Sequence, residues 1–133
     1  MAHLLLIDDD QRVLATNAAA LASGGHTHFS AGSAEEARRA LSARPPDMVI
    51  VEPLVPGSDG SFGLVKQIAA DYPDLPIIVL TRADDVLSRA ARDEQDLDGG
   101  WLPAQRFMEK PVAPAVLRDE VDHLLHELHG ERQ

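Results

Sequence analysis

The stretch that decides the fold is DMVIVEPLVPGSDG, residues 47–60. It contains a short apolar run, Met48 to Val51, bounded by turn-forming residues, which is typical of a strand buried on both faces. One acidic residue, Glu52, follows the run directly, and a loop rich in proline and glycine then leads to a helical pattern. In open α/β sheets, ligands and chemistry lie just beyond the carboxyl ends of the strands. Glu52 therefore stands where a reactive group would be.

Apolar runs and helical patterns alternate along the whole chain. Strands are predicted at 4–7, 26–31, 48–51, 77–80 and 107–109, and helices at 13–21, 34–43, 62–70, about 84–95 and 114–129. Strands separated by helices imply a parallel sheet with right-handed crossovers and helices on both faces. The expected fold is α/β, a five-stranded parallel sheet in the order 2-1-3-4-5. This order brings the ends of the first and third strands side by side.

Composition and charge limit the class of partner. The chain has 133 residues, 44% of them apolar, which fits a single domain, and few residues follow the last predicted helix to form an output domain. Its net charge of −10 would repel the phosphates of nucleic acids. The N-terminal apolar run is too short for a signal peptide, and no run approaches the length of a membrane span. We therefore expect a cytoplasmic protein with neither nucleic acid nor membrane as a partner.

Reactive side chains follow the ends of the predicted strands. They are Asp8 and Asp9 after the first strand, Glu52 after the third, Thr81 after the fourth and Lys110 after the last. Clustered carboxylates repel one another unless a cation neutralises them, and oxygen ligands of this kind suit Mg²⁺. A lysine and a hydroxyl group nearby could hold phosphoryl oxygens. One such acid alone would be a solvated residue, but the whole set favours a site.

These motifs resemble the receiver domain of two-component response regulators, and the resemblance covers nearly the whole chain. The matching pieces are Leu6–Asp10, Pro46–Val51, Pro56–Gly60, Ile78–Thr81 and Lys110–Pro111. The resemblance implies a flavodoxin-like (CheY-like) sheet in a signalling module that is not an enzyme. Its partners would be a histidine kinase or a downstream signalling protein. In the family, a histidine kinase or a small phosphodonor transfers a phosphoryl group to one aspartate.

The resemblance also implies a metal site at the carboxyl edge of the sheet. Asp8 and Asp9 would form the acidic pair that binds Mg²⁺, with Glu52 at the phosphoacceptor position. The backbone carbonyl of Leu54 would complete the shell of the ion. We expect Mg²⁺ to bind weakly, because Glu52 could pair with Lys110 instead of the metal.

The acceptor position departs from the family because it holds Glu52 in place of an aspartate. The extra methylene moves the carboxylate toward the volume of an attached phosphoryl group, and in-line attack does not tolerate small misplacements. Glu52 could instead reach Lys110 and Thr81, and so imitate the phosphorylated state. By resemblance, Thr81 is the switch hydroxyl and Phe107 the switch aromatic residue. We therefore expect a phosphorylation-independent or phosphorylation-mimicking interaction module with an active-like resting state.

A second departure is the length of the segment between Thr81 and Lys110. It is longer than is usual in the family, and the excess lies near residues 96–106, where Trp101 is expected to anchor the loop. In the family, the fourth helix, the last strand and the last helix form the usual output face. That face should be remodelled here, and the resemblance leaves a homodimer through it open.

A small phosphohydrolase similar to the haloacid dehalogenases is the alternative. Those enzymes also use an apolar strand that ends in Asp-x-Asp, a later strand that ends in threonine, and a lysine. Asp8 and Asp10 match the first of these motifs loosely. Arg12 stands where the motif needs a small or hydroxyl residue, and the alternative gives Glu52 no role.

Overall fold

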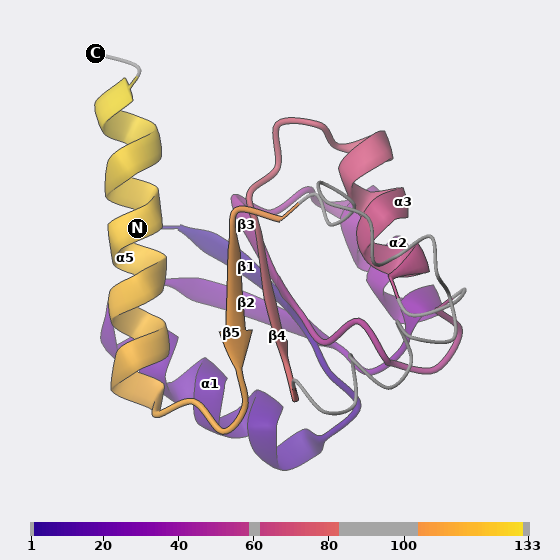
Figure 1. The fold of residues 1–133 in the computed structure, drawn as a ribbon, viewed down its shortest axis with the longest axis horizontal. Coiled ribbons are helices and arrows are strands. Elements are labelled where there is room, and N and C mark those ends of the chain that lie inside the picture. The colour runs from indigo at the N-terminus through magenta and orange to yellow at the C-terminus, as the bar shows by residue number, and fades with distance from the viewer. Residues whose placement is uncertain (1, 59–61, 83–103, 132–133) are drawn as a thin grey trace.

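A parallel sheet of five strands forms the centre of the molecule (Figure 1). The computed structural model describes residues 2–58, 62–82 and 104–131. The strands are β1 (His3–Ile7), β2 (Thr27–Ala31), β3 (Met48–Val51), β4 (Ile77–Thr81) and β5 (Arg106–Glu109). Their order is β2-β1-β3-β4-β5, and every neighbouring pair is parallel. The predicted fold class and strand order are confirmed.

Helices cover both faces of this sheet. In the described part of the chain they are α1 (Gln11–Ser23), α2 (Ala34–Ala43), α3 (Gly63–Asp71) and α5 (Pro114–Glu131). Helices α1 and α5 lie on one face, and α2 and α3 lie on the other (Figure 1). No helix within the described ranges is long and apolar enough to cross a membrane. The helix predicted near 84–95 and the expected anchor Trp101 lie outside the described residues.

Polar side chains fix where α1 and α2 begin. The carboxylate of Asp10 accepts hydrogen bonds from the backbone N–H groups of Arg12 and Val13, at 2.9 and 3.4 Å, and so satisfies donors that the first turn leaves unpaired. The hydroxyl group of Ser33 accepts from the N–H of Glu36 at 3.2 Å and does the same for α2. The predicted start of α1 at Val13 is late because the cap lies at Asp10.

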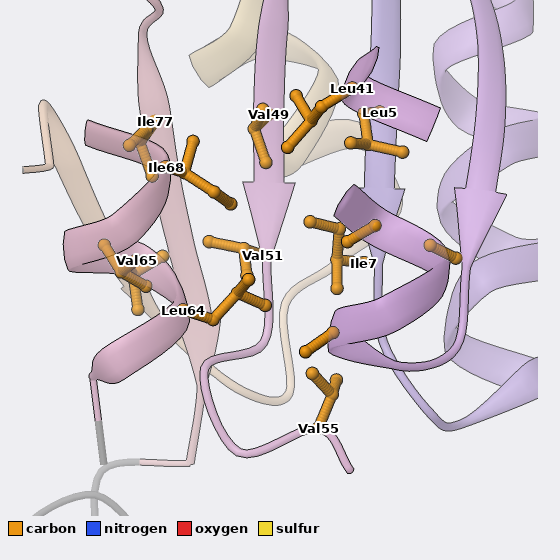
Figure 2. Packing of buried hydrophobic residues seen from close by; sticks show 14 residues of the cluster. Leu5, Ile7, Leu41, Val49, Val51, Val55, Leu64, Val65, Ile68 and Ile77 are labelled. Carbon is orange, nitrogen blue, oxygen red and sulfur yellow. The ribbon is translucent and has the colours of Figure 1, made fainter. Parts of the chain in front are cut away.

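The sheet separates two apolar clusters, because successive side chains of a strand point to opposite faces. Toward α2 and α3, the strands contribute Leu5, Ile7, Val49, Val51, Ile77 and Val79 (Figure 2). Toward α1 and α5, they contribute Leu4, Leu6, Met48, Ile50, Ile78 and Leu80. Residues 48–51 are buried on both faces, as their continuous apolar run predicts. The resulting rigid core holds the carboxyl ends of β1, β3 and β4 at one edge of the sheet.

The burial of α3 can be tested with one substitution at two positions. Val65 is fully buried in the cluster of Figure 2, whereas the side chain of Val116 on α5 is 54% exposed. We expect Val65→Ala to lower the free energy of unfolding by about 2–3 kcal/mol, through lost burial and a residual cavity. Val116→Ala should change it by less than about 0.5 kcal/mol. Urea unfolding followed by circular dichroism measures both, and equal losses would contradict this packing.

Candidate functional site

Backbone hydrogen bonds fix the positions from which the site is built. The N–H of Glu52 donates to the carbonyl of Ile7 at 2.8 Å, so Glu52 stands beside the end of β1. The N–H of Lys110 donates to the carbonyl of Thr81, also at 2.8 Å. The peptide bond that follows Lys110 is cis. These bonds hold residues distant in sequence at one edge of the sheet.

The ammonium group of Lys110 lies between two carboxylates. Its Nζ atom donates to Oδ2 of Asp8 at 2.6 Å and to Oε1 of Glu52 at 3.2 Å. The side chains of Lys110, Asp8 and Glu52 are only 14%, 5% and 10% exposed, so water screens these contacts little. Burial alone would lower the pKa of Lys110, but the hydrogen bond and charge of Asp8, together with Glu52, raise it above its ordinary value. Lys110 is therefore held as a cation.

Each carboxylate uses its second oxygen on the backbone. Oδ1 of Asp8 accepts from the N–H of Asp10 at 2.9 Å, and Oε2 of Glu52 accepts from the N–H of Leu54 at 3.2 Å. A buried carboxylate needs several such partners to remain charged. No sequence pattern indicated the N–H of Leu54 as a donor, because only the carbonyl of Leu54 has a role by resemblance. These two bonds orient both acids toward Lys110.

The hydroxyl group of Thr81 takes no part in this hydrogen-bond network. Its side chain is fully buried, and its Oγ1 atom has no hydrogen-bond partner among the residues described. The prediction that Glu52 would bond to Thr81 is therefore wrong, because Lys110 and the N–H of Leu54 already engage the two oxygens of Glu52. The expected contact of Glu52 with Lys110 is confirmed. Phe107 on β5 is 45% exposed.

The acidic residues offer oxygen ligands of the type that Mg²⁺ prefers, but they are not gathered around a common point. Asp8 and Glu52 face the Lys110 ammonium, whereas Asp9 is exposed. In the part of the chain that the structure describes, no three Asp, Glu, His or Cys side chains are grouped to hold a metal ion. In this arrangement, the cation that neutralises the acids is Lys110. The acids have the chemistry to hold a divalent ion, and two of them contact the Lys110 ammonium in this structure.

The sequence matches the family model of the response regulator receiver domain over residues 4–122, so the chain belongs to that family. Receiver domains act in two-component signalling, interact with histidine kinases and other signalling proteins, and generally bind Mg²⁺ at the phosphorylation site. The family match does not include the alternative of a phosphohydrolase similar to the haloacid dehalogenases, and the carboxylate of Asp10, which that alternative would use, caps α1. The resemblance seen in the sequence is confirmed.

Among curated proteins, the chain is 30% identical over 133 residues to the transcriptional regulatory protein AfsQ1 of Streptomyces coelicolor, covering 100% of this chain and 54% of that protein. It is 28% identical over 126 residues to the probable transcriptional regulator ycf27 of Cyanidium caldarium, covering 95% and 47%. The chain thus spans about half the length of these relatives.

Solved structures share the fold along almost the whole chain. A putative response regulator from Chloroflexus aurantiacus has a TM-score of 0.74 at 31% identity, covering 93% of this chain and 97% of that one. A CheY-like receiver domain protein from Methanospirillum hungatei has a TM-score of 0.79 and covers 98% of each chain. Its sequence identity is 18%, so this second likeness shows the fold alone.

The raised pKa of Lys110 predicts a pH dependence of stability. Its charged form stabilises the fold below the ordinary lysine pKa of about 10.4, and this contribution is lost as the pH rises through the higher pKa of the folded state. We expect the free energy of unfolding of the wild type, minus that of Lys110→Met, to be constant from about pH 7 to 9 and to decrease above about pH 10.5. Urea unfolding across this range measures the difference, and a constant difference would contradict the assigned contacts.

Proposed function

We propose that this receiver domain is a protein-interaction module of a two-component pathway and that its state does not depend on a phosphoryl group at Glu52. The observation that carries the proposal is the contact of Lys110 with Glu52 at 3.2 Å and with Asp8 at 2.6 Å. The lysine that would hold a phosphoryl oxygen is neutralised by the carboxylate at the acceptor position. The charge that phosphorylation would bring to this lysine is already supplied by the chain.

The reach of Glu52 also disfavours phosphoryl transfer. A nucleophilic carboxylate oxygen must lie in line with the phosphoryl group, and a displacement of about 1 Å can cost a factor of about a hundred in rate. Both oxygens of Glu52 are engaged, one by Lys110 and one by the N–H of Leu54. Attack would require Glu52 to leave these partners and to fit a longer side chain into the space for the phosphoryl group.

Full imitation of a phosphorylated state has less support than independence from phosphorylation. Imitation would need Thr81 to donate to the negative charge, and its hydroxyl group has no partner among the described residues. The contact of Glu52 with Lys110 is then the one interaction within the described ranges that would favour an active-like state over an inactive one. A charge-assisted hydrogen bond contributes about 1.5–3 kcal/mol at best, which shifts a two-state equilibrium by about one or two factors of ten.

The face formed by β5 and α5 is the surface we propose for protein partners, a second copy of this chain included. Phe107 on β5 and Val116 on α5 are large apolar side chains that are 45% and 54% exposed. A partner that covers this face would bury both side chains and gain the free energy of removing their apolar surface from water. A histidine kinase or a downstream signalling protein is the class of partner that the family supports.

The proposal predicts the outcome of incubation with acetyl phosphate and Mg²⁺. Intact-protein mass spectrometry should find no stoichiometric phosphoryl group on the wild type. Glu52→Asp should gain one, because the shorter acceptor leaves room for a phosphoryl group within reach of Lys110 and Thr81. Glu52→Gln is the matched control that keeps the length of the side chain and removes the nucleophile. A stoichiometric phosphoryl group on Glu52 in the wild type would refute the proposal.

We further propose that Mg²⁺ binds weakly, through Asp8, Asp9, Glu52 and the backbone carbonyl of Leu54, in competition with Lys110. The support is chemical: the acids suit Mg²⁺, but two of them already neutralise an ammonium group.

Competition with Lys110 predicts opposite effects of two substitutions on the affinity for Mg²⁺. Lys110→Met should tighten binding by about tenfold or more, since it removes the competing cation. Asp9→Ala should weaken binding, since it removes a ligand but leaves Lys110 in place. Amide chemical shifts during a titration with Mg²⁺ report the affinity of each variant. Tight binding in the wild type that Asp9→Ala leaves unchanged would refute the assigned site.

A further inference from the structure

A pocket of about 320 Å³ opens between the first half of α1, the end of β4 and the segment after β5. The residues that give it its chemical character are Arg12, Val13, Asn17, Leu80, Arg82 and Val112. Its volume is at the lower end of the range for small-molecule sites, about 300–1,000 Å³. It could hold a molecule about the size of a single substituted ring.

Asn17 is a buried polar residue that the fold does not use. It is 7% exposed and lines the pocket, and its side-chain amide has no hydrogen-bond partner among the described residues. Because Asn17 lines the pocket and its amide is not among the polar groups sealed inside the protein without a partner, the amide reaches the space of the pocket. The amide of Asn17 can therefore gain a partner from a molecule in the pocket.

Two arginines give the pocket its charge. Arg12 and Arg82 line it, and neither forms an ion pair with any residue in the described ranges, although the chain has 22 acidic residues. The other charged groups on its wall are already engaged. Asp10 accepts the N–H groups at the start of α1, and Lys110 is held by Asp8 and Glu52. Within the described ranges, no carboxylate therefore competes with an anion for the guanidinium groups of Arg12 and Arg82.

We propose that this pocket binds a small organic anion. A carboxylate or a phosphonate-type group pairs with Arg12 and Arg82, since guanidinium groups match both by geometry and charge. The amide of Asn17 gives a hydrogen bond, and the apolar body of the ligand packs on Val13, Leu80 and Val112. The proposal does not rest on loss of phosphoryl transfer and holds whether or not Glu52 accepts a phosphoryl group.

The pocket also borders the ion-paired lysine. Lys110 contributes to its wall, while the Nζ atom of the same residue contacts Asp8 and Glu52. An anion in the pocket would therefore lie close to the cation that neutralises the carboxyl edge of the sheet. Binding would therefore change the electrostatic potential at Lys110 without any covalent change of the protein.

Titration of the ¹⁵N-labelled protein with benzoate and with phenylphosphonate tests the proposal. Neither compound can donate a phosphoryl group. Both should shift the side-chain amide signal of Asn17 and the backbone signals of Val13 and Val112. Benzamide, which has the shape of benzoate without its charge, should bind at least about tenfold more weakly. Inorganic phosphate, which lacks an apolar body, should also bind more weakly than phenylphosphonate.

Exposed arginines provide matched variants for the same titration. Arg12→Gln and Arg82→Gln should each weaken binding of benzoate or phenylphosphonate by about threefold or more. Arg44→Gln, which removes the same charge before β3 at the opposite edge of the sheet, should leave the affinity unchanged. The proposal is overturned if neither anion shifts these signals, if benzamide binds as tightly as benzoate, or if Arg44→Gln has the effect of the other two variants.

Discussion

The ammonium group of Lys110 is the constraint on which the carboxyl edge of the sheet depends. Asp8 and Glu52 are almost completely buried, and two unpaired carboxylates at this depth would repel each other and would lack the hydration that water gives them. The single positive charge of Lys110 pairs with both carboxylates, at 2.6 and 3.2 Å, and so links the ends of β1 and β3 to the segment after β5. The backbone completes the arrangement by donating one N–H group to each acid. The chain itself therefore supplies the partners of both buried carboxylates at this edge of the sheet.

The sequence carried most of the information for this arrangement. Continuous apolar runs such as Met48–Val51 are typical of a parallel sheet covered on both faces, and their alternation with helical patterns favours the order that the structure shows. This order places the residues that follow β1, β3 and β5 at the same edge of the sheet. The length of a glutamate side chain then allows Glu52 to contact Lys110. Boundaries were less accurate where a cap decides them, as at Asp10, since the helix begins before its first apolar residue.

What the sequence could not supply was the choice among competing partners. Glu52 was expected to contact Thr81 as well as Lys110, and the N–H of Leu54 takes the place of Thr81. That outcome depends on the path of the loop after β3, which apolar patterns do not encode. Asn17 is different, because the sequence pattern around it does indicate a buried polar residue. It lies three residues after Leu14 and four before Leu21, both buried, and a polar residue on the buried face of a helix indicates a special role.

The shielding of Lys110 separates this region from the ionic conditions around the protein. Mobile ions screen charges in solution over about 8–10 Å at physiological ionic strength, and they act mainly on groups that water can reach. The pair Arg39–Glu35 is 71% and 74% exposed and is open to such screening. The contacts of Lys110 are not, because its side chain is 14% exposed and those of its partners are 5% and 10%. A rise in ionic strength would weaken ion pairs on the surface of the domain while the charges at the carboxyl edge keep their arrangement.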